Sequence, residues 1–363
     1  ARYTTLAQAG VKTLHRLLEK QIATSIQYFG IGAFTGLGSC IYLFSHLAAL
    51  WQDRSLLQEA EKLVQLLPEL IEKDEQYNLV DGAAGCLASL LSLYSVAPSE
   101  QTLQVGKLCG EHLLVHSQHG PEGLMWKAHQ QSGFSHGIAG IAWSLLRLAA
   151  VSGDERFRAA AGAALNYEHS VFSSIQDNWF QRGKRPGNTE QPSNQAESAI
   201  REEVHSDMSW SSGAPDIALG RLLSLPDLDD AVMRAELEMA LGATLAQGFG
   251  YAHERVGLNH SLAHGDCGNL EIVLIAARKL GTAQLHQALE RQTTQLLESI
   301  RQHGWVMGVP LNVPTPGLML GLAGMGYQCL RLVEPERVPS VLCLASPSAN
   351  LLYRGDISAT FTV

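Results

Sequence analysis

The sequence predicts an all-α protein whose helices form a closed ring, an α/α toroid (a double-layered helical barrel) with one long polar insertion. Three observations point to this fold: helical periodicity dominates, alternating strand-like patterns are almost absent, and a glycine quartet recurs along the chain. The 363 residues are 46% hydrophobic and only 17% charged, which leaves enough apolar side chains for a large core. We expect residues 1–363 to form a single domain.

Two kinds of helix can be predicted from the spacing of the apolar residues. Amphipathic helices are expected at residues 55–72, 231–245 and 280–300, because in each of them the apolar side chains gather on one side. Residues 138–146, in contrast, are apolar nearly all round, which is typical of a helix buried on every side.

The glycine quartet, Gly-x-x-Gly or a near copy, opens each fully apolar helix. Its first glycines are between 46 and 76 positions apart, enough for two helices and their loops in each unit. Small residues at the start of a buried helix let backbones approach closely and leave its N–H groups pointing at a shared centre. A solenoid would present the quartets along one face, but the apolar inner helices favour a closed ring that gathers them at one end. The quartets begin at Gly36, Gly82, Gly137, Gly213, Gly265 and Gly321.

The longest interruption of the helical pattern runs from about residue 174 to residue 209. Its many charged, Asn, Gln and Pro residues are typical of a mobile surface insertion, and its end, just before Trp210, would let it cover a site. The C-terminal residues 339–363 are rich in serine, and we expect them to pack irregularly.

Charge and composition exclude several classes of protein. With 26 Lys and Arg against 35 Asp and Glu the net charge is −9, and without basic runs we expect neither nucleic acid nor a membrane as partner. No apolar stretch approaches the roughly 18 residues of a membrane span, and the N-terminus opens no signal peptide. Six scattered cysteines without a Cys-x-x-Cys pair fit a reducing cytoplasm. The chain begins without Met, as a fragment of a longer polypeptide would.

Four ordered motifs resemble those of the lanthionine synthetase C-like family. Residues 132–140, Ser-Gly-Phe-Ser-His-Gly-Ile-Ala-Gly, resemble its histidine–glycine motif, and residues 209–217 resemble its Trp-Cys-x-Gly-x-Pro-Gly motif. Residues 260–271 resemble its Cys-His-Gly motif and residues 316–327 its last repeat. The last two are nearest the C-terminal cyclase domain of class II lanthipeptide synthetases. The resemblance runs from about Gly36 to Leu332 and implies an α/α toroid that acts on ribosomally made peptides.

The resemblance also implies a chemistry. Members of this family close thioether rings: a zinc ion held by two cysteines and one histidine binds the substrate thiol as a thiolate, which adds to a dehydrated Ser or Thr. A free thiol has a pKa of about 8.5, and a coordinating metal deprotonates it outright. The addition needs an acid to protonate the enolate carbon and a base to accept the thiol proton.

Carried over residue by residue, the zinc ligands are mostly missing here. The first ligand cysteine falls on Ser211 and the second on Ala263, so only the histidine, His264, remains. One imidazole cannot hold a catalytic zinc, which has three protein ligands and an open position. We therefore expect no zinc and no other cofactor. The alternative is Cys267, four residues after Ala263, as a displaced ligand.

The acid–base positions are only partly kept. The general-acid histidine of the family corresponds to His136, and the acidic residue corresponds to Asn78, which cannot act as a carboxylate. Ser212 stands where the class II proteins often have a second histidine. Trp210, Ser211, Ser212 and Asp266 are the expected substrate-binding residues.

Two function hypotheses follow from these positions. In the first, the domain binds a dehydrated precursor peptide and has lost zinc-dependent ring formation, with a dehydratase domain as a further expected partner in the same chain. In the second, His136 and His264, with Ser211, Ser212 and Asn78, form a metal-free site that catalyses addition or another step on a dehydrated peptide.

Other kinds of site have weaker support. A toroidal glycoside hydrolase needs two facing carboxylates, and no such pair is indicated among the aspartates near the motifs. Three histidines with helical spacing could bind a metal, but without a supporting carboxylate pattern a solvated helix face is the simpler interpretation. The aspartates are Asp207, Asp216 and Asp266, and the histidines are His112, His116 and His119.

Overall fold

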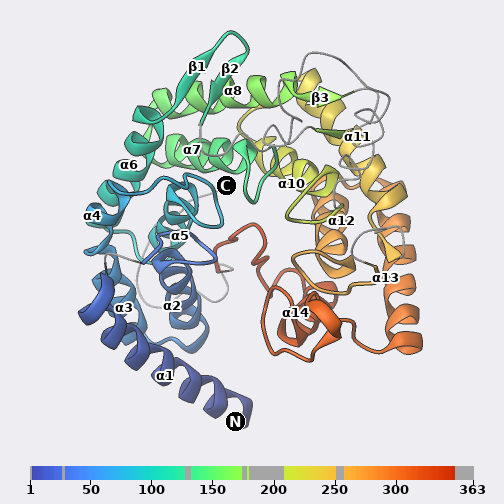
Figure 1. The fold of residues 1–363 in the computed structure, drawn as a ribbon, viewed down its shortest axis with the longest axis horizontal. Helices are drawn as coiled ribbons and strands as arrows, with labels where there is room; N and C mark the ends of the chain where they lie inside the picture. Colours follow the sequence, from blue (N-terminus) through green and yellow to red (C-terminus); the bar gives the residue numbers. More distant parts are fainter. Residues whose placement is uncertain are drawn as a thin grey trace, which may run out of the picture.

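The computed structural model describes residues 2–26, 29–126, 132–173, 178–179, 208–250 and 257–347. Its helices form a ring in two layers, and the chain follows the ring from blue to red (Figure 1). The all-α prediction is therefore confirmed, and the predicted toroid is seen directly. The inner layer consists of α2 (Leu37–Trp51), α5 (Ala83–Val96), α7 (Ile138–Ser152), α10 (Ala214–Ser224), α12 (Asp266–Leu280) and α14 (Leu322–Val333).

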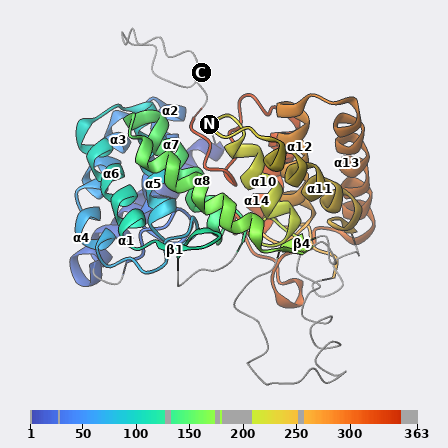
Figure 2. The same ribbon diagram turned by 90° about the horizontal axis from the view of Figure 1, so that it is seen from above.

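The outer layer covers the inner one, with α8 crossing in front of α7 when the ring is seen from above (Figure 2). The amphipathic segments predicted at 55–72, 231–245 and 280–300 correspond to helices of this layer. It consists of α1 (Arg2–Ser25), α3 (Arg54–Val64), the short α4 (Leu67–Ile71), α6 (Glu100–Val115), α8 (Glu155–Ser170), α11 (Ala231–Gln247) and α13 (Ala283–His303).

Regular structure besides these helices is sparse in the described part of the chain. Two short antiparallel pairs occur, β1 (Gln118–Gly120) with β2 (Gly123–Met125) and β3 (Phe172–Ser173) with β4 (Asn178–Trp179). A 3₁₀ turn, η3, covers Pro310–Asn312. Apart from Asn178, Trp179, Met208 and Ser209, the expected insertion at 174–209 lies outside the described residues. No described helix is long and apolar enough to cross a membrane.

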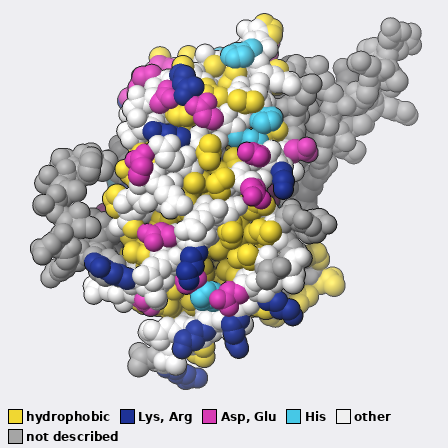
Figure 3. All heavy atoms as spheres, turned by 90° about the vertical axis from the view of Figure 1, so that its left-hand side faces the viewer, with side chains coloured by type: hydrophobic (Ala, Val, Ile, Leu, Met, Phe, Trp, Pro, Cys, Tyr) yellow, Lys and Arg dark blue, Asp and Glu magenta, His cyan; other side chains and the backbone are white. Residues whose placement is uncertain are grey.

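The core lies between the two layers. The first eleven residues of α5, from Ala83 to Leu93, are all buried, as are the first nine of α7, from Ile138 to Leu146. Helices apolar all round are thus the inner ones, because both their faces meet other helices. On the outer surface, basic and acidic side chains are interspersed with apolar ones, as over α3, α4 and α6 (Figure 3).

The second glycine of the quartet has the same packing role in four repeats. A Cβ at Gly85 would lie 1.8 Å from the carbonyl oxygen of Leu79, six residues earlier, so only glycine fits under the loop. The same holds for Gly140, Gly268 and Gly324, whose Cβ atoms would lie 1.8–2.0 Å from carbonyl oxygens six residues earlier. The quartet therefore exists because each loop folds back over the first turn of the inner helix that it precedes.

The ring is closed by the C-terminal segment, and not by packing of the last inner helix on the first. Consecutive inner helices pack on one another from α2 round to α14, but α14 and α2 do not pack extensively. Residues 339–345, here called the strap, pass through the middle of the ring (Figure 1). The Tyr327 hydroxyl donates to the carbonyl of Pro339 at 2.7 Å, and the Tyr42 hydroxyl donates to that of Ala345 at 2.8 Å. The strap thus connects α14 to α2. As expected for the C-terminal segment, it contains no regular helix or strand; residues 348–363 lie outside the described residues.

Candidate functional site

The loops that precede the inner helices form a connected rim at one end of the ring. Their residues are 30–36, 77–82, 132–137, 208–213, 259–265 and 315–321. Backbone hydrogen bonds join neighbouring loops: Phe34 N–H to Val80 O (3.1 Å), Val80 N–H to Ser135 O (3.2 Å) and Ala263 N–H to Met319 O (2.9 Å). The quartets therefore gather at one end of the ring, as the sequence predicted.

Ser211 and His264 meet across the rim. Ser211 lies just before α10 and His264 just before α12, and Ser211 Oγ is 2.8 Å from His264 Nδ1. A second hydroxyl, that of Ser209, lies 3.1 Å from Ser211 Oγ. Ser209 and Ser212 exchange two backbone hydrogen bonds of 3.0 Å, which fix the short turn that carries Ser211. The arrangement can hold or pass a proton between the serine hydroxyl and the imidazole.

The three positions that correspond to zinc ligands do not make a zinc site. They offer a hydroxyl from Ser211, a methyl group from Ala263 and one imidazole from His264, and Ala263 is itself buried. A catalytic zinc needs three donor side chains. In the described part of the chain, no group of three or more His, Cys, Asp or Glu side chains could hold a metal ion. The donor set present therefore does not fit the metal.

Cys267 is in the core. It is fully buried on α12, and this burial raises the pKa of its thiol well above the ordinary value. A thiol that burial keeps protonated is a poor metal ligand, since the thiolate is the form that coordinates. The position thus gives no support to a displaced zinc ligand.

His136 lies beside a carboxylate that sequence reasoning missed. Its Nδ1 is 3.7 Å from Asp81 Oδ2, and both side chains are about one third exposed, at 36% and 35%. The other oxygen of Asp81 accepts a hydrogen bond of 2.9 Å from the Thr35 hydroxyl. The pair can act as an acid or a base next to a bound molecule.

Aligning the quartets would have found Asp81. The residue directly before each first glycine is partly or fully exposed in all six repeats, and in the loops at 77–82, 132–137 and 259–265 it is the one residue that is not buried. In sequence order these rim positions are Thr35, Asp81, His136, Ser212, His264 and Leu320. The repeat therefore presents one such side chain per unit on the rim.

Asn78 fixes the backbone of Asp81. It is fully buried, and its Oδ1 accepts a hydrogen bond of 2.8 Å from the backbone N–H of Asp81. The position that corresponds to the family's acidic residue is thus inside the protein, and the carboxylate at the rim comes from three residues later.

The remaining predicted substrate-binding residues differ in exposure. Ser212 is partly exposed at the rim, but Trp210 is buried, with its ring 5.1 Å from that of Phe34 and its Nε1 donating to the carbonyl of Leu342 in the strap. Asp266 is buried at the start of α12, where its Oδ1 accepts a hydrogen bond from Gly250 N–H. Burial raises the pKa of Asp266 to about 6.

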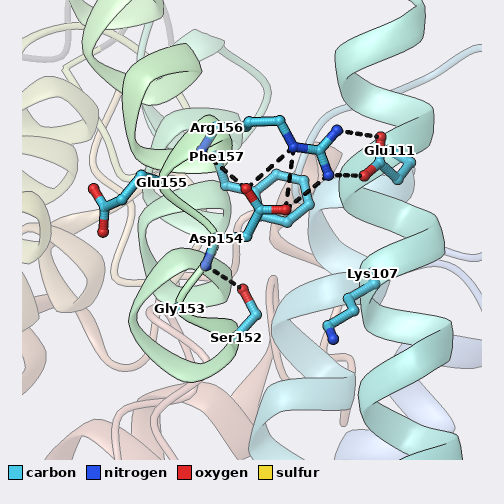
Figure 4. Close-up of a pocket in the computed structure, with 8 residues that line it drawn as sticks. All are labelled: Lys107, Glu111, Ser152, Gly153, Asp154, Glu155, Arg156 and Phe157. Carbon is cyan, nitrogen blue, oxygen red and sulfur yellow. Dashed lines mark hydrogen bonds and ion pairs between the residues drawn. The ribbon is translucent and has the colours of Figure 1, made fainter.

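The other candidates from the sequence lie elsewhere. The rings of His112 and His116 are tilted by 43° with centroids 4.3 Å apart, and His112 Nε2 lies 2.9 Å from the carbonyl oxygen of Asp74. His112 is buried, so the interpretation as a solvated helix face is wrong for this histidine. His119 lies on β1. Asp216 is buried, and Asp207 lies outside the described residues. A surface pocket between α6 and α8 belongs to the outer layer and is lined by the ion pairs of Arg156 with Asp154 and Glu111 (Figure 4).

Comparisons with known proteins agree with this architecture. A family model described as "Lanthionine synthetase C-like protein" matches residues 1–343. Among solved structures the chain is similar to nisin cyclase, with 15% identity, a TM-score of 0.64, and coverage of 94% of this chain and 86% of that one. It is also similar to a sugar epimerase from a ruminal bacterium, with 14% identity, a TM-score of 0.45, and coverage of 61% and 60%. No curated protein sequence matches it. At these identities the likeness to nisin cyclase shows the fold, an α/α toroid.

Proposed function

Because the chain belongs to the lanthionine synthetase C-like family, we propose that it binds a ribosomally made, dehydrated precursor peptide without forming thioether rings through zinc. In this proposal it is a divergent relative of the cyclase domain of class II lanthipeptide synthetases. It would work in the cytoplasm beside a dehydratase domain that supplies the dehydrated residues.

The observation that carries the proposal is the contact between Ser211 and His264. The hydroxyl stands at the position of a ligand cysteine and forms a 2.8 Å hydrogen bond with Nδ1 of the one histidine that remains. Ala263 adds no donor atom to this pair. Zinc-dependent activation of a thiol needs donors that these side chains do not supply, since a serine hydroxyl and an alanine methyl replace two thiolates.

The rim suits a peptide. Five polar side chains on the rim include both hydrogen-bond donors and hydrogen-bond acceptors: Thr35, Asp81, His136, Ser212 and His264. Peptide backbones need such partners when they leave water. Backbone hydrogen bonds fix the first three loops to one another and the fifth to the sixth, so little ordering of these loops is required when a peptide binds.

Calorimetric titration with a dehydrated precursor peptide tests binding. We expect saturable binding, weaker binding of the same peptide with serine in place of its dehydrated residues, and a modest loss of affinity in His136→Ala. The matched control is His286→Ala on α13, an exposed histidine of the outer layer, which should bind as the wild type does. Absence of saturable binding by the wild type, or equal losses in both variants, would overturn the proposal.

A second candidate function is a metal-free enzyme. It is favoured by two contacts: Ser211 with His264, and His136 with Asp81. General acid–base catalysis is worth about 10²–10⁴-fold, so His136→Ala should then slow turnover by a comparable factor while binding stays nearly intact. We favour the binding function, because an imidazole lowers the pKa of a neighbouring thiol only when the imidazole is itself charged.

A further inference from the structure

Buried carboxyl groups lie beneath the rim loop that carries His136. Asp216 lies on α10, in the next repeat, and Glu168 lies on α8, the outer helix of the same repeat as this loop; both are buried. Burying a carboxyl group is unfavourable unless it is hydrogen-bonded. The contacts of these two groups therefore show what they hold in place.

Two residues of the loop are fixed by these carboxyl groups. Asp216 Oδ1 accepts a hydrogen bond of 2.8 Å from the backbone N–H of Ser135, and its Oδ2 accepts one of 3.3 Å from the Ser135 hydroxyl. Glu168 Oε1 accepts one of 2.6 Å from Gly133 N–H. Ser135 directly precedes His136.

The loop is shaped to receive Asp216. Gly133 has φ +109°, a backbone conformation that residues with a side chain rarely adopt, and a Cβ there would lie 2.0 Å from Asp216 Oδ2. The carboxyl group of Asp216 thus occupies the space that a side chain at position 133 would need. Such complementarity between two repeats fixes the position of the loop along α10.

The same contacts reach the partner of His136. The carbonyl of Ser135 accepts a hydrogen bond of 3.2 Å from Val80 N–H, and Val80 directly precedes Asp81. Asp216 therefore supports, through Ser135, both the loop that carries His136 and the loop that carries Asp81. We propose that Asp216 is a positioning residue that holds His136 against Asp81 on the rim. That His136 matters for a bound peptide rests on the proposed function. That Asp216 determines the position of His136 does not rest on it.

Glu168 and Glu236 provide a comparison for Asp216. Arg221, which is fully buried, pairs with Glu168 at 2.5 Å and with Glu236 at 2.7 Å. Glu236 additionally pairs with His169 on the outer side, at 2.8 Å, and not with the loop. Glu236→Gln therefore perturbs buried charge nearby while it leaves the loop contacts in place, and it is the matched control for Asp216→Ala.

The test is the NMR signal of the His136 imidazole in protein labelled with ¹³C-histidine, identified by its loss in His136→Gln. We expect Asp216→Ala to shift and broaden this signal, and Asp216→Asn to restore it largely, because an amide oxygen still accepts from Ser135 N–H. Glu236→Gln should lower stability but leave the signal in place. If Asp216→Ala does not fold, Gly133→Ala gives the same test, since its Cβ displaces the carboxyl group. An unchanged His136 signal in the folded variant, or an equal change in Glu236→Gln, would overturn the proposal.

Peptide affinity supplies a second readout. If Asp216 acts through His136, Asp216→Ala and His136→Ala should weaken binding of the dehydrated peptide by similar factors, and the double variant should be no weaker than His136→Ala alone. Additive losses would contradict the positioning role. If the wild type binds no peptide, the proposed function fails, and the NMR comparison still decides the role of Asp216.

Discussion

At the scale of single residues, the proposal depends most on Ser211, whose hydroxyl stands where the family resemblance implies a ligand cysteine. The hydroxyl lies 2.8 Å from His264 Nδ1, so this imidazole nitrogen has a protein partner. A serine hydroxyl is a far weaker zinc ligand than a thiolate, because it does not ionise near neutral pH.

Zinc content tests this interpretation. Purified protein should carry no stoichiometric zinc, because Ser211 and Ala263 give no thiolate and Cys267 is buried in the core. Elemental analysis of protein prepared with zinc in the medium measures this. About one zinc per chain, lost in Cys267→Ala, would show instead that the site has moved.

The positive control for that measurement restores the ligands. Ser211→Cys with Ala263→Cys should recover zinc binding, since His264 already lies within hydrogen-bond distance of position 211. A folded double variant without zinc would mean that the geometry, and not only the residue types, has diverged.

A second residue-scale prediction concerns pH. Burial lowers the pKa of His46 to about 4 from its ordinary 6.5, so the unfolded chain binds a proton between these values that the folded protein does not. The free energy of unfolding therefore falls as pH drops through this window. Between pH 7 and pH 5 this histidine should remove about 2 kcal/mol, and His46→Phe should abolish that part of the decrease. Urea unfolding of both proteins at the two pH values checks it; equal decreases would contradict the buried neutral imidazole.

At the scale of elements, the quartet makes a prediction within one helix. In α14, a Cβ at Gly324 would lie 1.8 Å from the carbonyl of Leu318, whereas one at Gly326 would meet nothing within 4 Å. Gly324→Ala should destabilise by roughly 1–3 kcal/mol, the usual cost of overpacking, and Gly326→Ala should stabilise by about 0.5–1 kcal/mol through helix propensity. Thermal unfolding of the two variants compares them. Similar melting temperatures would remove the packing role given to the second glycine.

Elements were easier to predict from the sequence than contacts. The quartets at Gly82, Gly137, Gly265 and Gly321 each lie directly before an inner helix, because the close approach that needs glycine is local to the loop and the first turn. The contact of Ser211 with His264 and that of Ser135 with Asp216 join residues 53 and 81 positions apart. Such pairs depend on how one repeat is rotated against the next, which periodicity along the chain does not specify.

At the scale of the whole molecule, the strap completes the ring where α14 and α2 do not pack extensively. Leu342 in the strap is 1% exposed, and Leu330 on α14 is 57% exposed. Leu342→Ala should therefore cost about 2–5 kcal/mol, the range for buried leucines, and Leu330→Ala no more than about 0.5 kcal/mol. Denaturant unfolding distinguishes them. If both variants are as stable as the wild type, the strap does not hold the ring together.

In five of the six repeats the rim position directly before the first glycine is a polar residue, and in the sixth it is Leu320. Fixed loops, a proton-sharing serine–histidine pair and a histidine beside a carboxylate are compatible with holding a peptide. In the proposed function none of these groups replaces the zinc that makes a thiol nucleophilic at neutral pH. The central claim is therefore that the toroid binds the dehydrated peptide and leaves its thiol unreacted.

Ring closure of a dehydrated, cysteine-containing peptide at pH 7 tests this claim most directly. Loss of free thiol and the connectivity of the product are followed by alkylation and mass spectrometry, with added zinc, in three samples: wild type, His136→Ala and no protein. We expect equal rates in all three, since thiols add slowly to dehydroamino acids without a catalyst. A wild-type rate well above both others, by the roughly 10²–10⁴-fold of acid–base catalysis, would show an enzyme and contradict the account.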